Sequence, residues 1–150
     1  MKRWILGWMV ACGAGLALAA DPAGEKAIHD YTLTMPKVKA WAEATQAFND
    51  AAAKSPALAA EASGPGGSDD TLAQTIATFD RHPKLYAFYS AKGISKEEAA
   101  LVPLAIQGAC SVATYPQLAQ KMASMTSPAQ VAFCKTNLAE IRKLKVYGLE

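Results

Sequence analysis

The sequence has 150 residues, of which 51% are hydrophobic and 19% are charged, and its formal net charge is +2. This length suffices for one small domain with a hydrophobic core, but not for two. With 15 basic and 13 acidic residues and no basic cluster, the chain lacks the charge that binding to nucleic acid or to an anionic membrane surface requires, so we expect neither partner.

The first twenty residues have the order of an export signal. Lys2 and Arg3 precede an apolar run from Trp4 to Ala20, and Ala17-Leu18-Ala19 matches an A-x-A cleavage site. We therefore expect residues 1–20 to be removed on export. The mature chain would then carry no stable membrane span and be near neutral, since removing two of the 15 basic residues leaves 13 against 13 acidic ones.

Two alternatives stay open for this leader. One is an anchor that is not cleaved, although about 17 residues rich in Gly and Ala are short for a bilayer. The other uses Cys12, because Met9-Val10-Ala11-Cys12 resembles a bacterial lipobox, whose cysteine is lipidated after cleavage. Met is atypical at the first position of that motif, and the apolar run continues past Cys12. We expect a periplasmic or secreted protein, with lipid anchoring through Cys12 as the alternative.

The mature part keeps two cysteines, Cys110 and Cys134. An even pair in an oxidising compartment predicts a disulfide. On the chain-entropy estimate, closing this loop of about 25 residues stabilises the fold by roughly 3 to 4 kcal/mol. The alternative is a pair of buried free thiols, because cysteine also packs well in cores. Neither residue belongs to a C-x-x-C pair, so a redox enzyme is not expected.

The first half of the mature chain predicts two helices and a loop. Residues 21–33 show no sustained period and are expected to form an extended lead-in. Thr34, followed by Pro36, has the pattern of a helix start and predicts a helix from about 35 to 53. Residues 54–70 are rich in Pro, Gly and Ser, which predicts a flexible loop. A second, shorter helix follows, capped by Asp69 or Asp70 and ending near His82-Pro83.

An aromatic segment follows Pro83. It runs from Leu85 to Ala91 and closes at Gly93, which is a signal for a helix C-terminus. Aromatic residues at helical spacing are usually core. Because Tyr86, Phe88 and Tyr89 cannot all face one way, we expect at least one of them to face a groove or a partner. These three residues are the candidate binding surface.

The second half predicts a buried central helix and a final helix. Ser95 and Glu98 form a capping box before Ala99–Ala113, a run almost free of polar side chains, and Pro103 predicts a kink or a restart within it. Ser127-Pro128 starts the last helix. Cys110 and Cys134 both fall on core-facing stripes, which makes the disulfide plausible. The chain is predicted to be all-α: one domain over residues 34–147, a bundle of about four principal helices plus short pieces.

Three segments in this order resemble an uncharacterised family of exported bacterial proteins. They are Tyr31-Thr32-Leu33-Thr34-Met35, Gly93-Ile94-Ser95 with its acidic turn, and Ser127-Pro128-Ala129-Gln130-Val131-Ala132-Phe133. The resemblance covers most of residues 31–145 and implies an envelope location and a small helical fold. Members of that family usually carry an aromatic residue after the acidic pair, where this chain has Ala99-Ala100, which argues against a site there.

No group of residues forms a catalytic or metal-binding signature. His29 and His82 share no ligand spacing with each other or with a cysteine, so no zinc site and no cofactor are expected. Asp80-Arg81-His82 is an ordinary charged cluster at a helix end. Asp69-Asp70 and Glu97-Glu98 stand where helices begin, and acids there favour the positive end of the helix dipole.

Two hypotheses of function follow. The first is a non-enzymatic periplasmic or secreted protein that binds another protein or an envelope component through a helical face. The second is a small carrier of an apolar ligand, held in the bundle or in the aromatic groove. An enzyme ranks behind both, because no catalytic motif is present.

Overall fold

The described chain is entirely helical. The computed structural model describes residues 21–62 and 70–144, and within these ranges it contains no strand. The elements are α1 (Pro22–Asp30), α2 (Met35–Ala52), α3 (Pro56–Ala62), α4 (Leu72–Arg81), α5 (Pro83–Ser90), α6 (Lys96–Thr114), the 3₁₀-helix η1 (Pro116–Leu118) and α7 (Pro128–Lys143). The predicted all-α bundle is confirmed, and α2, α4, α6 and α7 are its four longest helices.

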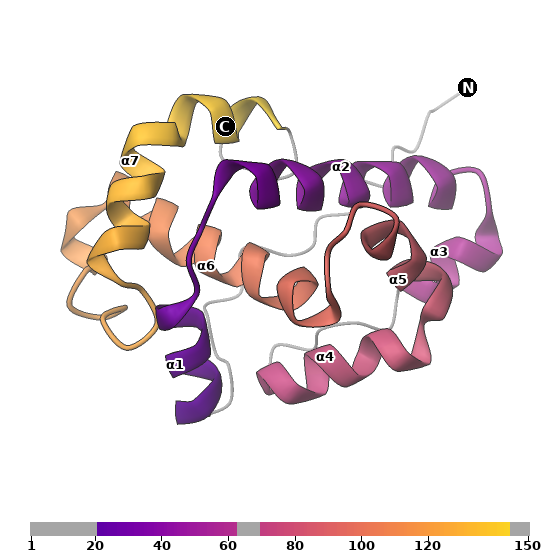
Figure 1. The fold of residues 1–150 in the computed structure, drawn as a ribbon, viewed down its shortest axis with the longest axis horizontal. Helices are drawn as coiled ribbons and strands as arrows, with labels where there is room; N and C mark the ends of the chain where they lie inside the picture. Colours follow the sequence, from indigo (N-terminus) through magenta and orange to yellow (C-terminus); the bar gives the residue numbers. More distant parts are fainter. Residues whose placement is uncertain (1–20, 63–69, 145–150) are drawn as a thin grey trace, which may run out of the picture.

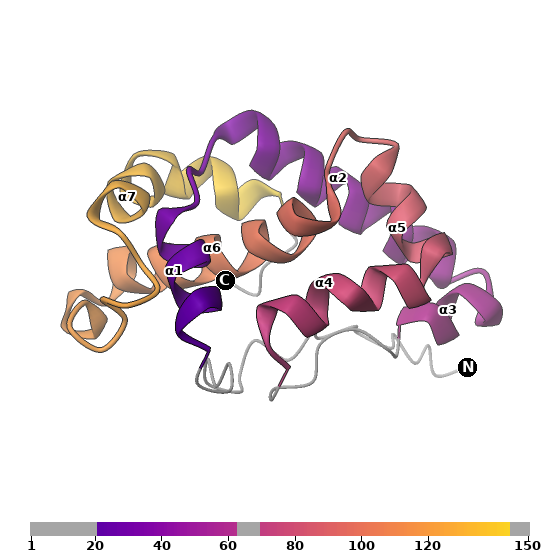
Figure 2. The same ribbon diagram turned by 60° about the horizontal axis from the view of Figure 1, so that its bottom comes forward.

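Helix α6 is the centre of the bundle. It runs through the middle of the molecule with α2 along one side and α4 along another, and α7 packs against it near its C-terminal end (Figures 1 and 2). Ile106, Ala109 and Cys110 are fully buried. The sequence accounts for this position, because a helix that is apolar on all sides has no face suited to water and must be surrounded by other helices.

Pro103 does not interrupt α6. Proline lacks the N–H donor and crowds the preceding turn, which costs about 3 kcal/mol in a helix interior. The helix is nevertheless continuous from Lys96 to Thr114, so the restart is excluded, while the alternative of a kink stays a prediction. The reason is tertiary, since α6 packs against α1, α2, α4, α5 and α7, and these contacts outweigh the local cost.

Two helices begin where the sequence signals place them. The predicted capping box of α6 is confirmed: the Ser95 hydroxyl accepts the Glu98 N–H at 3.1 Å, and the Glu98 carboxylate accepts the Ser95 N–H at 3.0 Å. The predicted start of α7 is also confirmed, with Ser127 as N-cap and Pro128 at the first position. Helix α5 ends before Gly93, which has the positive φ of 70° that favours glycine at a helix C-terminus.

The cap of α4 lies one residue beyond the expected position. Thr71, not Asp69 or Asp70, is the N-cap, and its hydroxyl accepts the Gln74 N–H at 3.2 Å. The Gln74 side chain accepts the Thr71 N–H at 2.7 Å, which completes a capping box. Thr-x-x-Gln is the same type of signal as Ser-x-x-Glu, so it could have been recognised in the sequence.

Two short helices occupy segments where none was predicted. Residues 21–33 are not an extended lead-in, because α1 forms with Pro22 at its first position and with Ile28 buried against the bundle. Helix α3 takes up the first part of the predicted loop 54–70. The rest of that loop, the leader at residues 1–20 and the end at residues 145–150 lie outside the described residues.

Candidate functional site

The aromatic residues expected to form a binding surface divide between core and surface. Tyr89 is buried, its hydroxyl lies 3.2 Å from the Thr45 hydroxyl, and burial raises its pKa. Phe88 packs edge-on against Phe48 with ring centroids 5.5 Å apart. Tyr86 is half-buried, and the Lys96 ammonium lies 5.3 Å from its ring centroid. Tyr89 is therefore a core residue, whereas Phe88 and Tyr86 keep part of their surface exposed.

The two cysteines meet at the centre of the molecule. Cys110 on α6 and Cys134 on α7 are both 0% exposed, and their sulfur atoms lie 2.8 Å apart. This separation is longer than the covalent bond of about 2.05 Å, so the disulfide stays a prediction. The hydrogen bond that the two thiols share lowers the pKa of Cys110 and raises that of Cys134. Cys12, the alternative lipidation site, lies outside the described residues.

The titratable residues do not assemble into a metal centre within the described part of the chain. No group of three or more His, Cys, Asp and Glu side chains comes together in residues 21–62 and 70–144. His82 meets a single carboxylate, that of Glu61 on α3, with Nδ1 and Oε2 3.7 Å apart. Glu98 serves the cap of α6 and pairs with Lys37 at 2.9 Å.

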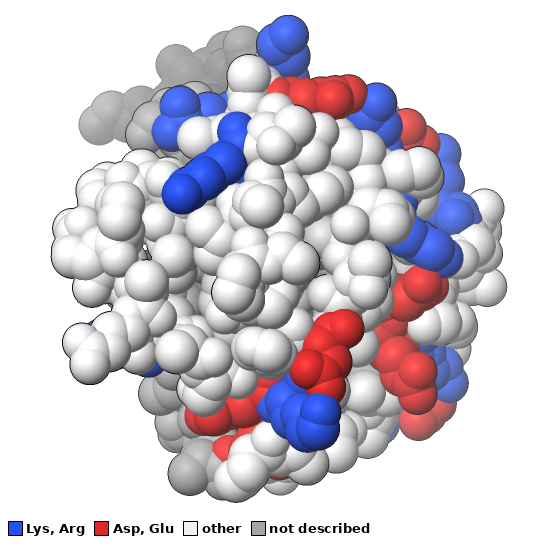
Figure 3. All heavy atoms as spheres, turned by 60° about the vertical axis from the view of Figure 1, so that its left-hand side comes forward, with Lys and Arg blue, Asp and Glu red and all other residues white. Residues whose placement is uncertain are grey.

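One end of the molecule is almost free of charge. Between Ala99 and Cys134 the sequence has a single charged residue, Lys121. This stretch forms most of α6, the 3₁₀-helix, the turns that follow it and the start of α7. Figure 3 shows a broad uncharged surface, with acidic and basic side chains above it, below it and to its right. We call the surface formed by residues 111–133, in which exposed Lys121 is the one charged residue, the uncharged end.

Tyr115 is the most prominent apolar group at the uncharged end. It is the C-cap of α6, its side chain is 56% exposed, and it is the exposed large hydrophobic residue of the described chain. Exposed amide and small side chains surround it in the sequence: Pro116, Gln117, Ala119, Gln120, Ala123 and Ser124. The one charged residue among these neighbours is Lys121, and an exposed tyrosine in a surface poor in charge is typical of a protein-binding surface.

Close packing holds the turns of the uncharged end against α6. A Cβ atom at Gly108 would lie 2.6 Å from Oγ1 of Thr126 and 3.4 Å from Cε of Met122, so only glycine permits this approach. Thr126 is buried, and its hydroxyl has no hydrogen-bond partner among the described residues. The turns between η1 and α7 are thus fixed by contact with the central helix rather than by hydrogen bonds from this side chain.

A shallow groove lies next to the uncharged end, between the α1–α2 connection and the start of α7. Its volume is about 410 Å³. It is lined by His29, Asp30, Tyr31, Thr32, Leu33, Ser127, Ala129, Gln130 and Phe133. The side of the groove from the α1–α2 connection carries both apolar and charged residues, whereas the side from α7 is uncharged.

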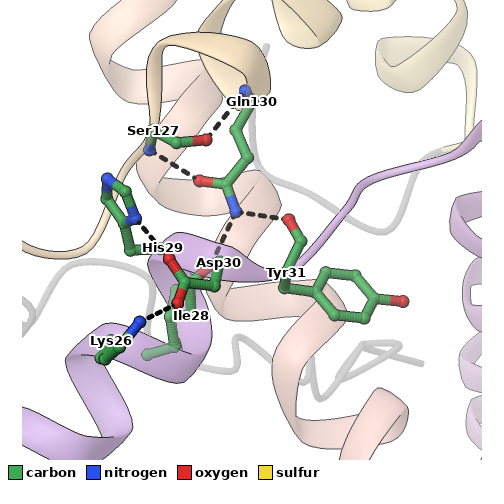
Figure 4. Close-up of polar contacts among 7 residues, drawn as sticks. All are labelled: Lys26, Ile28, His29, Asp30, Tyr31, Ser127 and Gln130. Carbon is green, nitrogen blue, oxygen red and sulfur yellow. Dashed lines mark hydrogen bonds and ion pairs between the residues drawn. The ribbon is translucent and has the colours of Figure 1, made fainter.

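Gln130 joins the two sides of this groove. Its side-chain amide, buried at 2% exposure, donates to the carbonyl oxygens of Ile28 at 2.6 Å and Tyr31 at 2.8 Å. Its side-chain oxygen accepts the Ser127 N–H at 3.0 Å, as the capping box of α7 requires (Figure 4). One side chain therefore both starts α7 and anchors it to the connection between α1 and α2.

The rim of the groove carries a small ionic cluster. Asp30 contacts Lys26 one turn earlier, and it lies 2.9 Å from His29 Nδ1 (Figure 4). The hydrogen bond from Lys26, followed by that from His29, lowers the pKa of Asp30. Tyr31 is partly buried, and burial together with the nearby Glu98 raises its pKa to about 12. At neutral pH the rim therefore presents an ionised carboxylate and an un-ionised phenol.

The groove contains the residue types of a hydrolytic triad without their arrangement. A serine nucleophile must be hydrogen-bonded to its histidine base, which a carboxylate orients. Asp30 does contact His29, but the Ser127 hydroxyl accepts the Gln130 N–H at 3.3 Å as the cap of α7. Among the described residues no hydrogen bond joins Ser127 to His29. The serine therefore acts as the cap of α7.

Sequence reasoning missed both the uncharged end and Gln130. A count of charged residues along the chain would have found the first. For Gln130, the Ser-x-x-Gln pattern predicts the local bond to Ser127, but nothing in the sequence indicates its contacts with Ile28 and Tyr31, about a hundred positions away.

Fold and site together define a small all-α bundle with one uncharged end and an adjoining shallow groove. No helix within the described ranges is both long enough and apolar enough to cross a membrane. The sequence matches no protein-family model, no curated protein and no solved structure.

Proposed function

We propose that this chain is an exported, non-enzymatic protein of the bacterial envelope that binds another protein through its uncharged end. The support for export comes from the leader, with its basic start, apolar run and A-x-A site. The resemblance to a family of exported helical proteins agrees with it. In this proposal the leader at residues 1–20 is cleaved, and a disulfide joins Cys110 to Cys134 in the periplasm or outside the cell.

The observation that carries the binding proposal is that the exposed residues of the uncharged end, 111–133, include a single charged side chain, that of Lys121. A protein surface ordinarily carries many charged residues, and the centres of protein interfaces are depleted of them, because each buried charge must be desolvated. Tyr115 adds a rigid aromatic group that buries a large area at a small cost in conformational entropy. The same lack of charge disfavours a nucleic acid or an anionic lipid as the partner.

Site-specific photocrosslinking in intact cells of the source organism tests the partner. A photoreactive residue at Gln117, in the uncharged end, should give a discrete adduct, whereas one at Gln46, exposed on α2, should not. Introducing Tyr115→Lys in the Gln117 probe should abolish the adduct, because the partner would have to bury a charge. Equal adducts at both positions, or an adduct that Tyr115→Lys leaves unchanged, would refute the uncharged end as the binding surface.

Mass spectrometry of the exported protein tests its processing. A mature chain that begins near Ala20 and is two hydrogens lighter than the dithiol would support both cleavage and the bond between Cys110 and Cys134. A lipid on Cys12 would replace the first part of the proposal with an anchored lipoprotein. Two free thiols in freshly exported protein would contradict the disulfide.

A second candidate function, carrier of a small apolar ligand, is favoured by the groove. Its volume of about 410 Å³ is in the range of small-molecule sites, and Leu33, Tyr31 and Phe133 contribute apolar surface. Native mass spectrometry distinguishes this function from protein binding. A bound small molecule that Phe133→Ala releases, while Tyr115→Lys does not, would favour the carrier.

A further inference from the structure

The thiols of Cys110 and Cys134 are in contact with each other and shielded from solvent by the surrounding helices. Cys110 and Cys134 are 0% exposed, with their sulfur atoms 2.8 Å apart, and the Cys134 sulfur lies 4.0 Å from the carbonyl oxygen of Ile106. Ile106 and Ile141, on the same two helices, are also 0% exposed. The pair is thus placed for bonding but is closed to any reagent in solution.

Thiol–disulfide exchange needs access that this arrangement does not give. A thiolate must attack a sulfur of the donor disulfide directly, and a mixed disulfide with the donor must fit in between. Neither step is possible between packed helices. Because Cys110 and Cys134 lie on different helices, the smallest motion that frees them is the departure of α7 from α6.

Apolar packing on α6 holds α7 in place, with Ile141 fully buried, and two polar side-chain contacts tie α7 to other parts of the chain. At its start, Gln130 donates to the carbonyl oxygens of Ile28 and Tyr31. Toward its end, Glu140 pairs with Lys39 of α2 at 2.6 Å, but both side chains are about half exposed, so this pair contributes little. Gln130 is therefore the polar contact best placed to control whether α7 opens.

We propose that Cys110 and Cys134 form a gated thiol pair, in which exchange with a disulfide donor occurs only while α7 is detached from α6. Closing the bond then fixes the docked position of α7, and the docked helix shields the bond from reductants. The inference deepens the disulfide in the proposed function: the bond is made before or during the docking of α7 and not on the finished fold.

The chemistry balances with a donor disulfide as the oxidant, either a disulfide-exchange protein or a small disulfide such as oxidised glutathione. One cysteine thiolate attacks the donor, its S–S bond breaks, and a donor thiolate leaves. The thiolate of the other cysteine then attacks the protein's sulfur atom in the mixed disulfide, which forms the bond between Cys110 and Cys134, and the second donor thiolate leaves. Two protons and two electrons pass from the cysteine pair to the donor, which becomes two thiols.

The test measures how fast oxidised glutathione oxidises the reduced mature protein, with free thiols counted after an acid quench. Folded protein should react at least a hundredfold more slowly than protein unfolded in urea at the same pH. Gln130→Ala should speed the reaction of folded protein roughly 30- to 100-fold, because detaching α7 breaks the Gln130 bonds to Ile28 and Tyr31. The effect is smaller than on global unfolding, because the bond between Gln130 and Ser127 lies within α7 and survives its departure. Gln74→Ala, which removes a capping glutamine from α4, is the matched control and should change it less than threefold.

Each other outcome overturns the inference. Equal rates in folded and unfolded protein would show that the thiols are reachable without opening. Equal acceleration by Gln130→Ala and Gln74→Ala, or an oxidation rate of folded protein that rises with urea as steeply as global unfolding does, would show that global unfolding, not the departure of α7, exposes the thiols. Because the donor is added to purified reduced protein, these results do not depend on whether the cell forms the bond, which mass spectrometry of the exported protein decides separately.

Discussion

Replacing Gln130 by alanine is the sharpest test of how this bundle is held together. The change removes three hydrogen bonds, two from the amide to the carbonyl oxygens of Ile28 and Tyr31 and one from the Ser127 N–H to the side-chain oxygen. The side chain is 2% exposed, so water does not readily replace its contacts. Gln74 offers a natural comparison, because its exposed side chain completes the same kind of capping box at the start of α4 without a hydrogen bond to a distant segment.

The magnitude follows from these contacts. Each lost bond costs about 0.5 to 1.5 kcal/mol net, with more where a buried partner is left unsatisfied. Burial lost with the shortened side chain adds about 1 kcal/mol. Gln130→Ala should therefore lower the free energy of unfolding by about 3 to 4 kcal/mol. Gln74→Ala loses only a local cap and should cost about 1 kcal/mol or less.

Urea unfolding followed by circular dichroism measures both variants. The midpoint of Gln130→Ala should fall well below that of Gln74→Ala with little change in the slope m, because the folded state keeps its helices. Gln130→Met, which keeps the volume of the side chain but not its polar atoms, should remain destabilised by about 2 to 3 kcal/mol. If Gln130→Ala cost no more than Gln74→Ala, the long-range bonds to Ile28 and Tyr31 would contribute nothing, and the reasoning would be refuted.

Two further perturbations test other parts of the fold. Burial acts to raise the pKa of Glu98, but the Ser95 N–H and Lys37 outweigh it and hold that pKa below its ordinary value of 4.5. Ionised Glu98 therefore stabilises the fold above pH 4.5, and this contribution is lost as the pH falls through the lowered pKa that Glu98 has in the folded state. Glu98→Gln should reduce this loss of stability in acid, as measured by urea titrations between pH 6 and pH 3. Gly108→Ala should lower the free energy of unfolding by about 1 to 3 kcal/mol, because the new Cβ would lie 2.6 Å from the Thr126 hydroxyl oxygen. Adding Thr126→Ala to this variant should restore part of the loss in urea unfolding. A loss that is unchanged in the double variant would contradict a steric cause.

The sequence predicts helices best where a local signal and burial agree. Ser95 with Glu98 and Ser127 with Pro128 mark helix starts that the structure confirms. The apolar run after Ala99 likewise indicates the buried central helix. In each case the signal lies within one turn of the element it starts, so tertiary contacts are not needed to interpret it.

The predictions from sequence failed where contacts between distant segments of the chain determine the local structure. Helix α1 has no long apolar stripe, and burial of Ile28 stabilises it in the folded bundle. The continuous path of α6 through Pro103 depends on helices packed around it, which no local rule includes. The contacts of Gln130 show the same division. Its capping bond to Ser127 is local, but its bonds at the groove are to carbonyl oxygens of a chain segment about a hundred residues earlier.

The uncharged end and the gated thiols depend on the same structural fact, which is that α7 is docked on α6. Residues at the start of α7 form one edge of the uncharged end, and Gln130 fixes that start in position. A binding surface that is already ordered loses less conformational entropy on binding than one whose segments must first become ordered. A bond between Cys110 and Cys134 would stabilise this docked arrangement by a loop-closure effect of roughly 3 to 4 kcal/mol. In the proposed function, the buried cysteines and Gln130 would thus hold the parts of the binding surface in place before the partner arrives.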